Sequence, residues 1–153
     1  MPYRKVQFAE GQFYHIYNRG AGRQPIFREE ENYLFLLRRV KKYASAFHIA
    51  VIAYCLMPNH YHFLLRQDDQ EPAGQLTQRV FNSYTKAFNK RYDRTGTLFE
   101  GPYKAIHIDQ DRYLLHLCRY IHANPVKHGW YLIWSNGPLP ITWSGLAPAT
   151  ASW

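Results

Sequence analysis

The stretch "HIAVIAYCLMPNHYHFLLR", residues 48–66, decides the fold of this chain. Its first ten residues are nearly all apolar, as expected of a central strand. The Pro58-Asn59 pair then predicts a turn, and a second β-prone segment follows over residues 60–66. The pattern predicts an antiparallel β-hairpin with a tight turn. Two histidines, His60 and His62, open the second strand directly after that turn.

The second strand of this hairpin has two chemically different faces. Side chains alternate along a strand, so Tyr61, Phe63 and Leu65 would share one apolar face. His60 and His62 would share the other face, with their Cα atoms roughly 6.5 Å apart. That spacing lets both imidazoles converge on one metal ion or one phosphate group. The strand therefore predicts a core on one side and a ligand site on the other.

Signals on both sides of the hairpin predict a split βαβ arrangement. Residues 12–18 are β-prone, and residues 28–46 combine helical apolar spacing with an acidic start and a basic end. We expect a second helix over 75–92, a fourth strand over 97–108 and a third helix over 109–124. The order predicts an α+β fold of the ferredoxin-like class, in which helices cover one face of an antiparallel sheet.

The C-terminal segment differs in composition from the rest of the chain. Residues 131–153 contain no Asp, Glu, Lys or Arg, and they are rich in Trp, Pro and Gly. This composition is too irregular to predict a regular element. With 153 residues and 46% hydrophobic residues, the chain has the length and apolar content of one ordinary domain. We expect a single domain over residues 1–153 that ends in this uncharged tail.

Positive charge makes nucleic acid the first partner to consider. The chain has 19 Lys and Arg against 11 Asp and Glu, a formal net charge of +8. On the expected second helix, Arg79, Lys86 and Lys90 fall within about 40° of one another, and an aromatic stripe lies opposite them. We interpret the aromatic stripe as core and the basic stripe as a contact for the backbone of a nucleic acid. Lys104 and Arg119 are further candidates for that contact.

Cysteine content and the N-terminal sequence argue against a disulfide-rich, secreted or membrane-spanning protein. Cys55 and Cys118 are the only cysteines, so neither a disulfide framework nor a cysteine-rich zinc site is available. The first residues lack the apolar stretch of a signal peptide, and no segment has the length of a membrane span. The sequence predicts a cytoplasmic protein with no membrane partner, associated with the nucleoid when it is bound to DNA.

A second candidate element of the site lies on the expected third helix. Tyr120 and Asn124 are four residues apart and so share one face of that helix. A tyrosine and an amide, together with His60 and His62, suggest phosphoryl transfer.

Four segments of the sequence, in a fixed order along the chain, resemble motifs of a known family. They are "YHIYNRG" (14–20), "AYCLMPNHYHFLLR" (53–66), "GTLFEGPYKA" (96–105) and "RYIHANPVKHGW" (119–130). In this order they resemble the single-tyrosine HUH transposases, and are most similar to the branch called REP-associated tyrosine transposases, relatives of the small bacterial insertion-sequence transposases. The resemblance spans roughly residues 13–130, and four ordered motifs are far more specific than a lone H-x-H.

The resemblance implies a metal-dependent endonuclease and strand transferase of single-stranded, hairpin-forming DNA, usually a homodimer. By position, His60 and His62 would be metal ligands for Mg²⁺ or Mn²⁺, and Tyr120 would be the nucleophile. Asn124 would be the third ligand, at a position where the insertion-sequence branch usually carries glutamine.

The chemistry of a tyrosine nucleophile agrees with this assignment. A phenol with a pKa near 10 is a poor nucleophile at neutral pH, so attack on a phosphodiester needs a cation on the nonbridging oxygens. The resulting 5′-phosphotyrosine is an activated ester, because a phenolate leaves more easily than an alkoxide. A DNA 3′-OH can therefore reverse the step without ATP.

Two other function classes remain open at this point. A ferredoxin-like sheet with a basic surface is also typical of noncatalytic modules that bind single-stranded nucleic acid. A metallohydrolase could instead use His60 and His62 to activate water. His15, on the expected first strand, could approach the site or form a hydrogen bond within the sheet, and it stays outside the predicted metal set.

Overall fold

The predicted hairpin is the centre of the sheet in a computed structural model, which describes residues 6–110, 116, 132–133 and 142–143. Strand β2 (Ile49–Met57) runs to the turn at Pro58 and Asn59, and β3 (His60–Gln67) returns beside it. Met57 pairs with His60, so both candidate histidines follow the turn as predicted.

The remaining strands complete the antiparallel arrangement expected from the element order. Strand β1 (Phe13–Arg19) pairs with β3 on one side and with β4 (Lys104–Ile108) on the other. The sheet order β4-β1-β3-β2 is that of a ferredoxin-like fold. The α+β class and the split βαβ arrangement are therefore confirmed.

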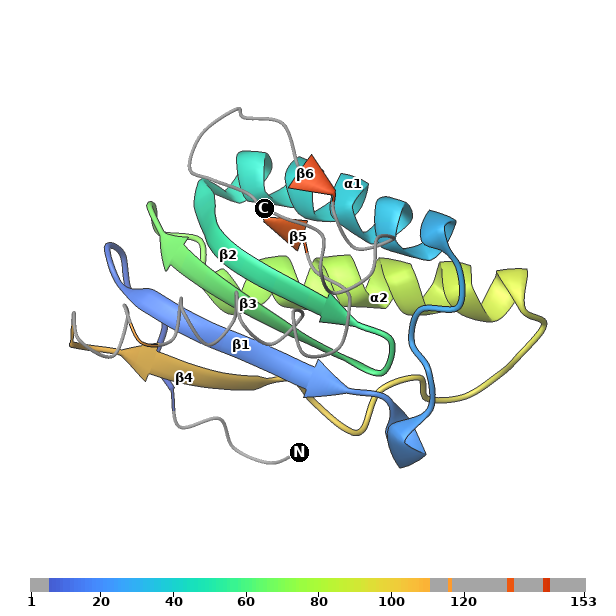
Figure 1. Cartoon of the computed structure of the whole chain (residues 1–153). Helices are drawn as coiled ribbons and strands as arrows, with labels where there is room; N and C mark the ends of the chain where they lie inside the picture. Colours follow the sequence, from blue (N-terminus) through green and yellow to red (C-terminus); the bar gives the residue numbers. More distant parts are fainter. Residues whose placement is uncertain (1–5, 111–115, 117–131, 134–141, 144–153) are drawn as a thin grey trace.

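Two helices cover one face of this sheet (Figure 1). Helix α1 (Glu30–Phe47) starts with a capping box and ends at His48, whose positive φ of 54° closes the last turn. Helix α2 (Ala73–Arg91) packs beside α1, and the short 3₁₀ helix η1 (Ala21–Arg23) lies in the loop after β1. No helix in the described residues is long and apolar enough to span a bilayer.

The main core fills the space between the helices and the sheet. Strand β3 contributes Tyr61, Phe63 and Leu65, the apolar set predicted from the sequence. The two helices contribute the side chains on the faces that point toward the sheet. The predicted aromatic stripe consists of Phe81, Tyr84 and Phe88 on α2 and Tyr92 directly after it. The first three side chains are buried in this core, and Tyr92 packs against it. The side chains that β3 and α2 bury in this core include Tyr61, Phe63, Leu65, Phe81, Tyr84 and Phe88.

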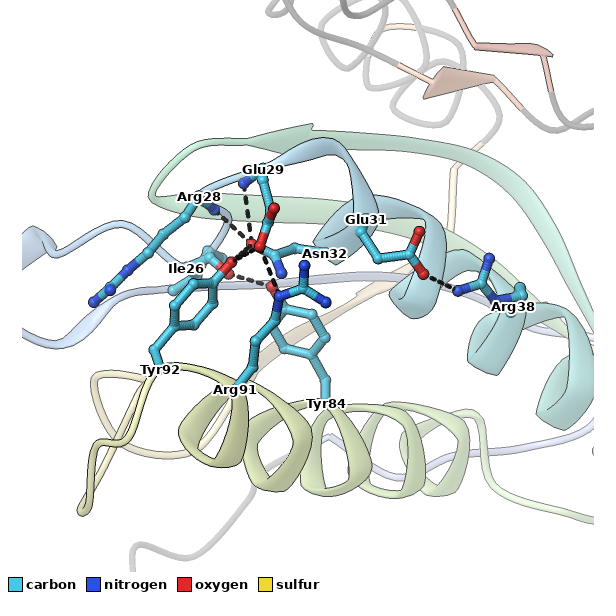
Figure 2. Close-up of polar contacts among 9 residues, drawn as sticks. All are labelled: Ile26, Arg28, Glu29, Glu31, Asn32, Arg38, Tyr84, Arg91 and Tyr92. Atoms are coloured by element: carbon cyan, nitrogen blue, oxygen red, sulfur yellow. Dashed lines mark hydrogen bonds and ion pairs between the residues drawn. The ribbon is translucent and has the colours of Figure 1, made fainter.

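Polar contacts join the start of α1 to the end of α2 (Figure 2). Arg91 Nε donates to Glu29 Oε1 at 2.6 Å, and the Tyr92 hydroxyl donates to the same carboxylate oxygen. Inside the protein, the Tyr84 hydroxyl donates to the carbonyl oxygen of Ile26. The exposed ion pair contributes little stability, whereas the buried hydroxyl fixes α2 against the loop that precedes α1.

Two expectations about the later part of the chain were wrong. The strand expected over 97–108 covers only 104–108, because Gly101 has a positive φ of 71° and Pro102 has no N–H for a sheet ladder. The tail is also not devoid of regular structure: β5 (Leu132–Ile133) pairs with β2, and β6 (Thr142–Trp143) pairs with β5. These two-residue strands are too short to leave a periodic signal in the sequence.

Candidate functional site

The candidate site lies on the sheet face that points away from α1 and α2. In the β1–β3 register, Tyr17 is opposite His62 and Arg19 is opposite His60. Alternation along β1 then places His15 on the same face, two residues before Tyr17. Neighbouring strands thus bring together histidines that are more than 40 positions apart in the chain.

Three imidazoles form a contiguous cluster on this face. His15 Nε2 and His62 Nδ1 share a hydrogen bond of 3.0 Å, and the two rings stack with centroids 5.2 Å apart. The rings of His60 and His62 meet edge to face at 5.3 Å. Tyr17 stacks on both His15 and His62, at 4.8 and 5.8 Å. The ring planes of the cluster are therefore fixed by packing as well as by the hydrogen bond.

The turn that carries His60 is anchored to the loop after β1. Pro58 O accepts hydrogen bonds from the backbone N–H groups of Ile26 and Phe27, at 2.7 and 3.2 Å. Asn59 Oδ1 lies 2.8 Å from His60 Nδ1, so the amide oxygen can accept the proton of that ring nitrogen. The entry of β3 is thereby held by contacts outside the hairpin itself.

Burial keeps two of the histidines uncharged. It lowers the pKa of His62 to about 3, and the neighbouring rings of His15 and His60 lower that pKa further. Burial alone lowers the pKa of His15 to about 4. Both rings are therefore neutral at pH 7, and neutral imidazole is the form that binds metal.

An open pocket of about 900 Å³ adjoins the cluster and has a basic rim. His60 and His62 line it, and Arg19, Arg23 and Lys104 supply positive charge. Its one acidic lining residue among the described positions is Glu100, which forms a two-pronged ion pair with Arg19. The hydrogen bond from Arg19 holds the pKa of Glu100 below its ordinary value, and Lys104 and Arg23 act in the same direction. Such a rim is suited to an anionic ligand.

The histidine pair fits a divalent metal ion by the chemistry of its donor atoms. A metal-ligating histidine usually contacts its protein partner through the other ring nitrogen, so the contacts at Nδ1 of His60 and of His62 favour Nε2 as the ligating nitrogen in each. Within the described residues, no group of three or more His, Cys, Asp and Glu side chains could hold a metal. A third ligand would have to be of another type or lie elsewhere in the chain.

The sequence-predicted site residues fall into three groups. His60, His62 and Lys104 meet at the pocket. Arg79, Lys86 and Lys90 are exposed on α2, which covers the opposite face of the sheet, so the structure does not bring them to the histidines. The third group, Tyr120, Asn124 and Arg119, lies outside the described residues, as does most of the helix expected over 109–124.

Sequence reasoning left the place of His15 open and missed three other contributors to the pocket and the cluster, Tyr17, Arg19 and Arg23. His15, Tyr17 and Arg19 occupy alternate positions of "YHIYNRG", and that alternation was a readable signal of one strand face. The missing information was the β1–β3 register, which sets these residues opposite the paired histidines. Arg23 comes from η1 and carried no pattern of its own.

Comparison with protein families found one match over most of the chain. The model of the family described as "Transposase IS200 like" matches residues 9–124, a range that includes every candidate site residue. No curated protein matches the chain.

Two solved structures share the fold. A REP-associated tyrosine transposase bound to a REP hairpin aligns with a TM-score of 0.68 and 18% identity, covering 85% of this chain and 76% of that one. A protein from Deinococcus radiodurans R1, described as a candidate transposase, aligns with a TM-score of 0.53 and 14% identity. That alignment covers 79% of this chain and 96% of the other.

Proposed function

The chain belongs to the family of IS200-like transposases, and we propose that it is a metal-dependent tyrosine transesterase that cleaves and rejoins single-stranded DNA. The observation that carries the proposal is the meeting of His60 and His62 at a pocket with a cationic rim. A neutral histidine pair suits a divalent ion, and the rim suits the phosphates of a nucleic acid.

In the proposed reaction, the phenolate oxygen of Tyr120 attacks a phosphodiester and forms a bond to phosphorus. The P–O3′ bond breaks, so one strand ends in a free 3′-OH and the other is held as a 5′-phosphotyrosine. The tyrosine loses its proton to solvent, and the departing 3′ oxygen gains one. Attack by another 3′-OH on the phosphotyrosine runs the same steps in reverse and rejoins DNA.

The other side chains position the phosphate. His60 and His62, with Asn124 as third ligand, would hold Mg²⁺ or Mn²⁺, which supplies positive charge to the nonbridging phosphate oxygens. Arg23 and Lys104 on the rim would bind neighbouring phosphates.

Positive charge outside the pocket would hold a longer DNA. Arg79, Lys86 and Lys90 are exposed on α2, on the far side of the sheet from the histidines. They would therefore bind a part of the DNA beyond the scissile strand, and Arg119 would bind close to Tyr120.

Hairpin-forming DNA is the proposed substrate, and the REP-associated branch is the proposed relationship. The similar structure of the REP-associated tyrosine transposase bound to a REP hairpin supports both, together with the four ordered sequence segments. One nucleophilic tyrosine per chain can form a covalent bond to one DNA end at a time. We therefore propose that strand transfer between two ends takes place in a homodimer.

A denaturing gel of the purified protein with end-labelled hairpin DNA and Mn²⁺ tests this function. We expect a covalent protein–DNA band that is lost in Tyr120→Phe, in the double variant His60→Ala/His62→Ala, and on addition of chelator. Tyr43→Phe, at a half-buried tyrosine of α1, on the side of the sheet opposite the histidines, is the matched control and should keep the band.

The two other function classes give different results on the same gel. Cleavage that persists in Tyr120→Phe without a covalent band would identify a metal-activated water as nucleophile. Binding without cleavage on a panel of hairpins would identify a noncatalytic binding module. The burial of Phe81, Tyr84 and Phe88 excludes these α2 rings as a surface on which bases could stack.

A further inference from the structure

His15 is a buried histidine that the proposed reaction does not use. Only 6% of the surface of His15 is exposed, and its Nε2 lies 3.0 Å from Nδ1 of His62. It sits on β1, the strand hydrogen-bonded to β3, so its position relative to His62 is set by the sheet ladder. Tyr17 stacks against both rings and restricts their rotation.

The short contact between the two ring nitrogens decides where His62 carries its proton. A neutral imidazole has one N–H, and only one of two facing nitrogens can donate. If His62 donates from Nδ1, the lone pair of its ring is on Nε2, where a metal ion can bind. If His15 donates from Nε2 instead, the His62 proton is on its own Nε2 and blocks ligation.

The surroundings of His15 permit the tautomer that metal binding requires. To accept at Nε2, a neutral His15 must carry its proton on Nδ1. That Nδ1 is buried and has no hydrogen-bond partner among the described residues. A backbone N–H donating to Nδ1 would have forced His15 to donate from Nε2, and no such donor is present in the described part of the chain.

We propose that His15 is a positioning residue that accepts the Nδ1 proton of His62 and so presents Nε2 of His62 to a divalent metal ion. The inference rests on the proposed function, because it takes His60 and His62 as the metal ligands. His15 itself does not touch metal or DNA in this account. Its effect is carried through the orientation and the tautomer of His62.

Manganese binding to the full-length protein without DNA is the test, with free Mn²⁺ followed by electron paramagnetic resonance. We expect His15→Leu, which cannot accept a hydrogen bond, to bind Mn²⁺ about 10- to 100-fold more weakly than the wild type. In His15→Gln, Oε1 is as many bonds from Cβ as Nε2 is in histidine, so this variant should keep most of the affinity. His107→Ala removes an exposed histidine from the neighbouring strand β4 and should bind like the wild type.

Four measurements tell the possible failures apart. Circular dichroism and thermal unfolding establish that each variant is folded. If His62→Ala leaves Mn²⁺ affinity unchanged, the proposed metal site itself is wrong. If His62→Ala loses binding while a folded His15→Leu keeps it, only the role of His15 is overturned. Nitrogen-15 spectra of the Mg²⁺-loaded protein should show the His62 proton on Nδ1, and a proton on Nε2 would contradict the inference.

Discussion

At the scale of single residues, burial controls the histidine cluster. His62 and His15 have folded-state pKa values of about 3 and about 4, whereas a histidine in an unfolded chain titrates near 6.5. Between these values the unfolded chain binds more protons than the folded one. Acidification therefore favours unfolding, and the stability present above pH 6.5 is lost as the pH falls toward 4.

The variant His15→Leu should flatten this pH dependence. Each buried histidine contributes a slope of up to about 1.4 kcal/mol per pH unit over that range, and the variant lacks one of them. Urea unfolding in chelator at several values between pH 7 and pH 4.5 measures the slope, with His107→Ala as the exposed-histidine control. Parallel stability curves for the wild type and His15→Leu would show that His15 is not buried as a neutral ring.

The basic rim of the pocket gives a second prediction at this scale. Lys104→Ala should weaken binding of a single-stranded oligonucleotide and lower the slope of log affinity against log salt by about 0.7, the value of one phosphate contact. Fluorescence anisotropy over a salt series measures both quantities. Lys41→Ala, an exposed lysine on α1, should leave both unchanged. Equal slopes for wild type and Lys104→Ala would remove Lys104 from the interface.

At the scale of elements, the hairpin turn and α2 are linked through one loop. The Tyr84 hydroxyl binds the carbonyl of Ile26, and the N–H groups of Ile26 and Phe27 bind Pro58 O. Asn59, the next residue of the turn, contacts His60. A helix on one face of the sheet thus supports the histidine on the other.

Removing this support should cost stability. Tyr84→Phe keeps the buried ring but leaves the Ile26 carbonyl without its side-chain donor, so we expect a loss of about 1–2 kcal/mol in the free energy of unfolding. Urea denaturation measures it, and Tyr43→Phe on α1 should be nearly neutral. A loss below a few tenths of a kcal/mol would mean that the hydroxyl contributes little to the anchor.

Elements with a strong local pattern were predictable, and the others were not. The hairpin, β1 and both helices follow from alternation, from helical spacing and from the Pro58-Asn59 turn. The expected fourth strand was too long because it extended across Gly101 and Pro102, neither of which favours a sheet ladder. For the site, the spacing of His60 and His62 showed a shared face, but His15 joins them only through strand register, which is a long-range property.

At the scale of the whole molecule, positive charge lies on two sides of the sheet. Arg23 and Lys104 border the pocket on the histidine face, while the basic stripe of α2, Arg79, Lys86 and Lys90, is exposed beyond the opposite face. A short single strand in the pocket could not reach α2, whereas a hairpin with a long stem offers phosphates to both surfaces. The two surfaces should therefore contribute separately to DNA affinity.

The triple variant Arg79→Ala/Lys86→Ala/Lys90→Ala separates these contributions. We expect it to weaken binding of a long hairpin and to leave the affinity for a short unstructured oligonucleotide unchanged, apart from a small effect of net charge. Anisotropy titrations with the two labelled DNAs at one salt concentration compare them. Equal weakening for both DNAs would indicate a general charge effect, and no weakening for either would exclude the stripe from DNA binding.

The central claim is that Tyr120 becomes covalently joined to DNA, and mapping the attachment site tests it most directly. The adduct formed with hairpin DNA and Mn²⁺ would be digested with nuclease and protease, and the modified peptide sequenced by mass spectrometry. The account predicts a nucleotide attached through its 5′ phosphate to Tyr120, with no such peptide when chelator is present. Attachment to any other residue, or DNA cleavage without a modified peptide, would contradict it.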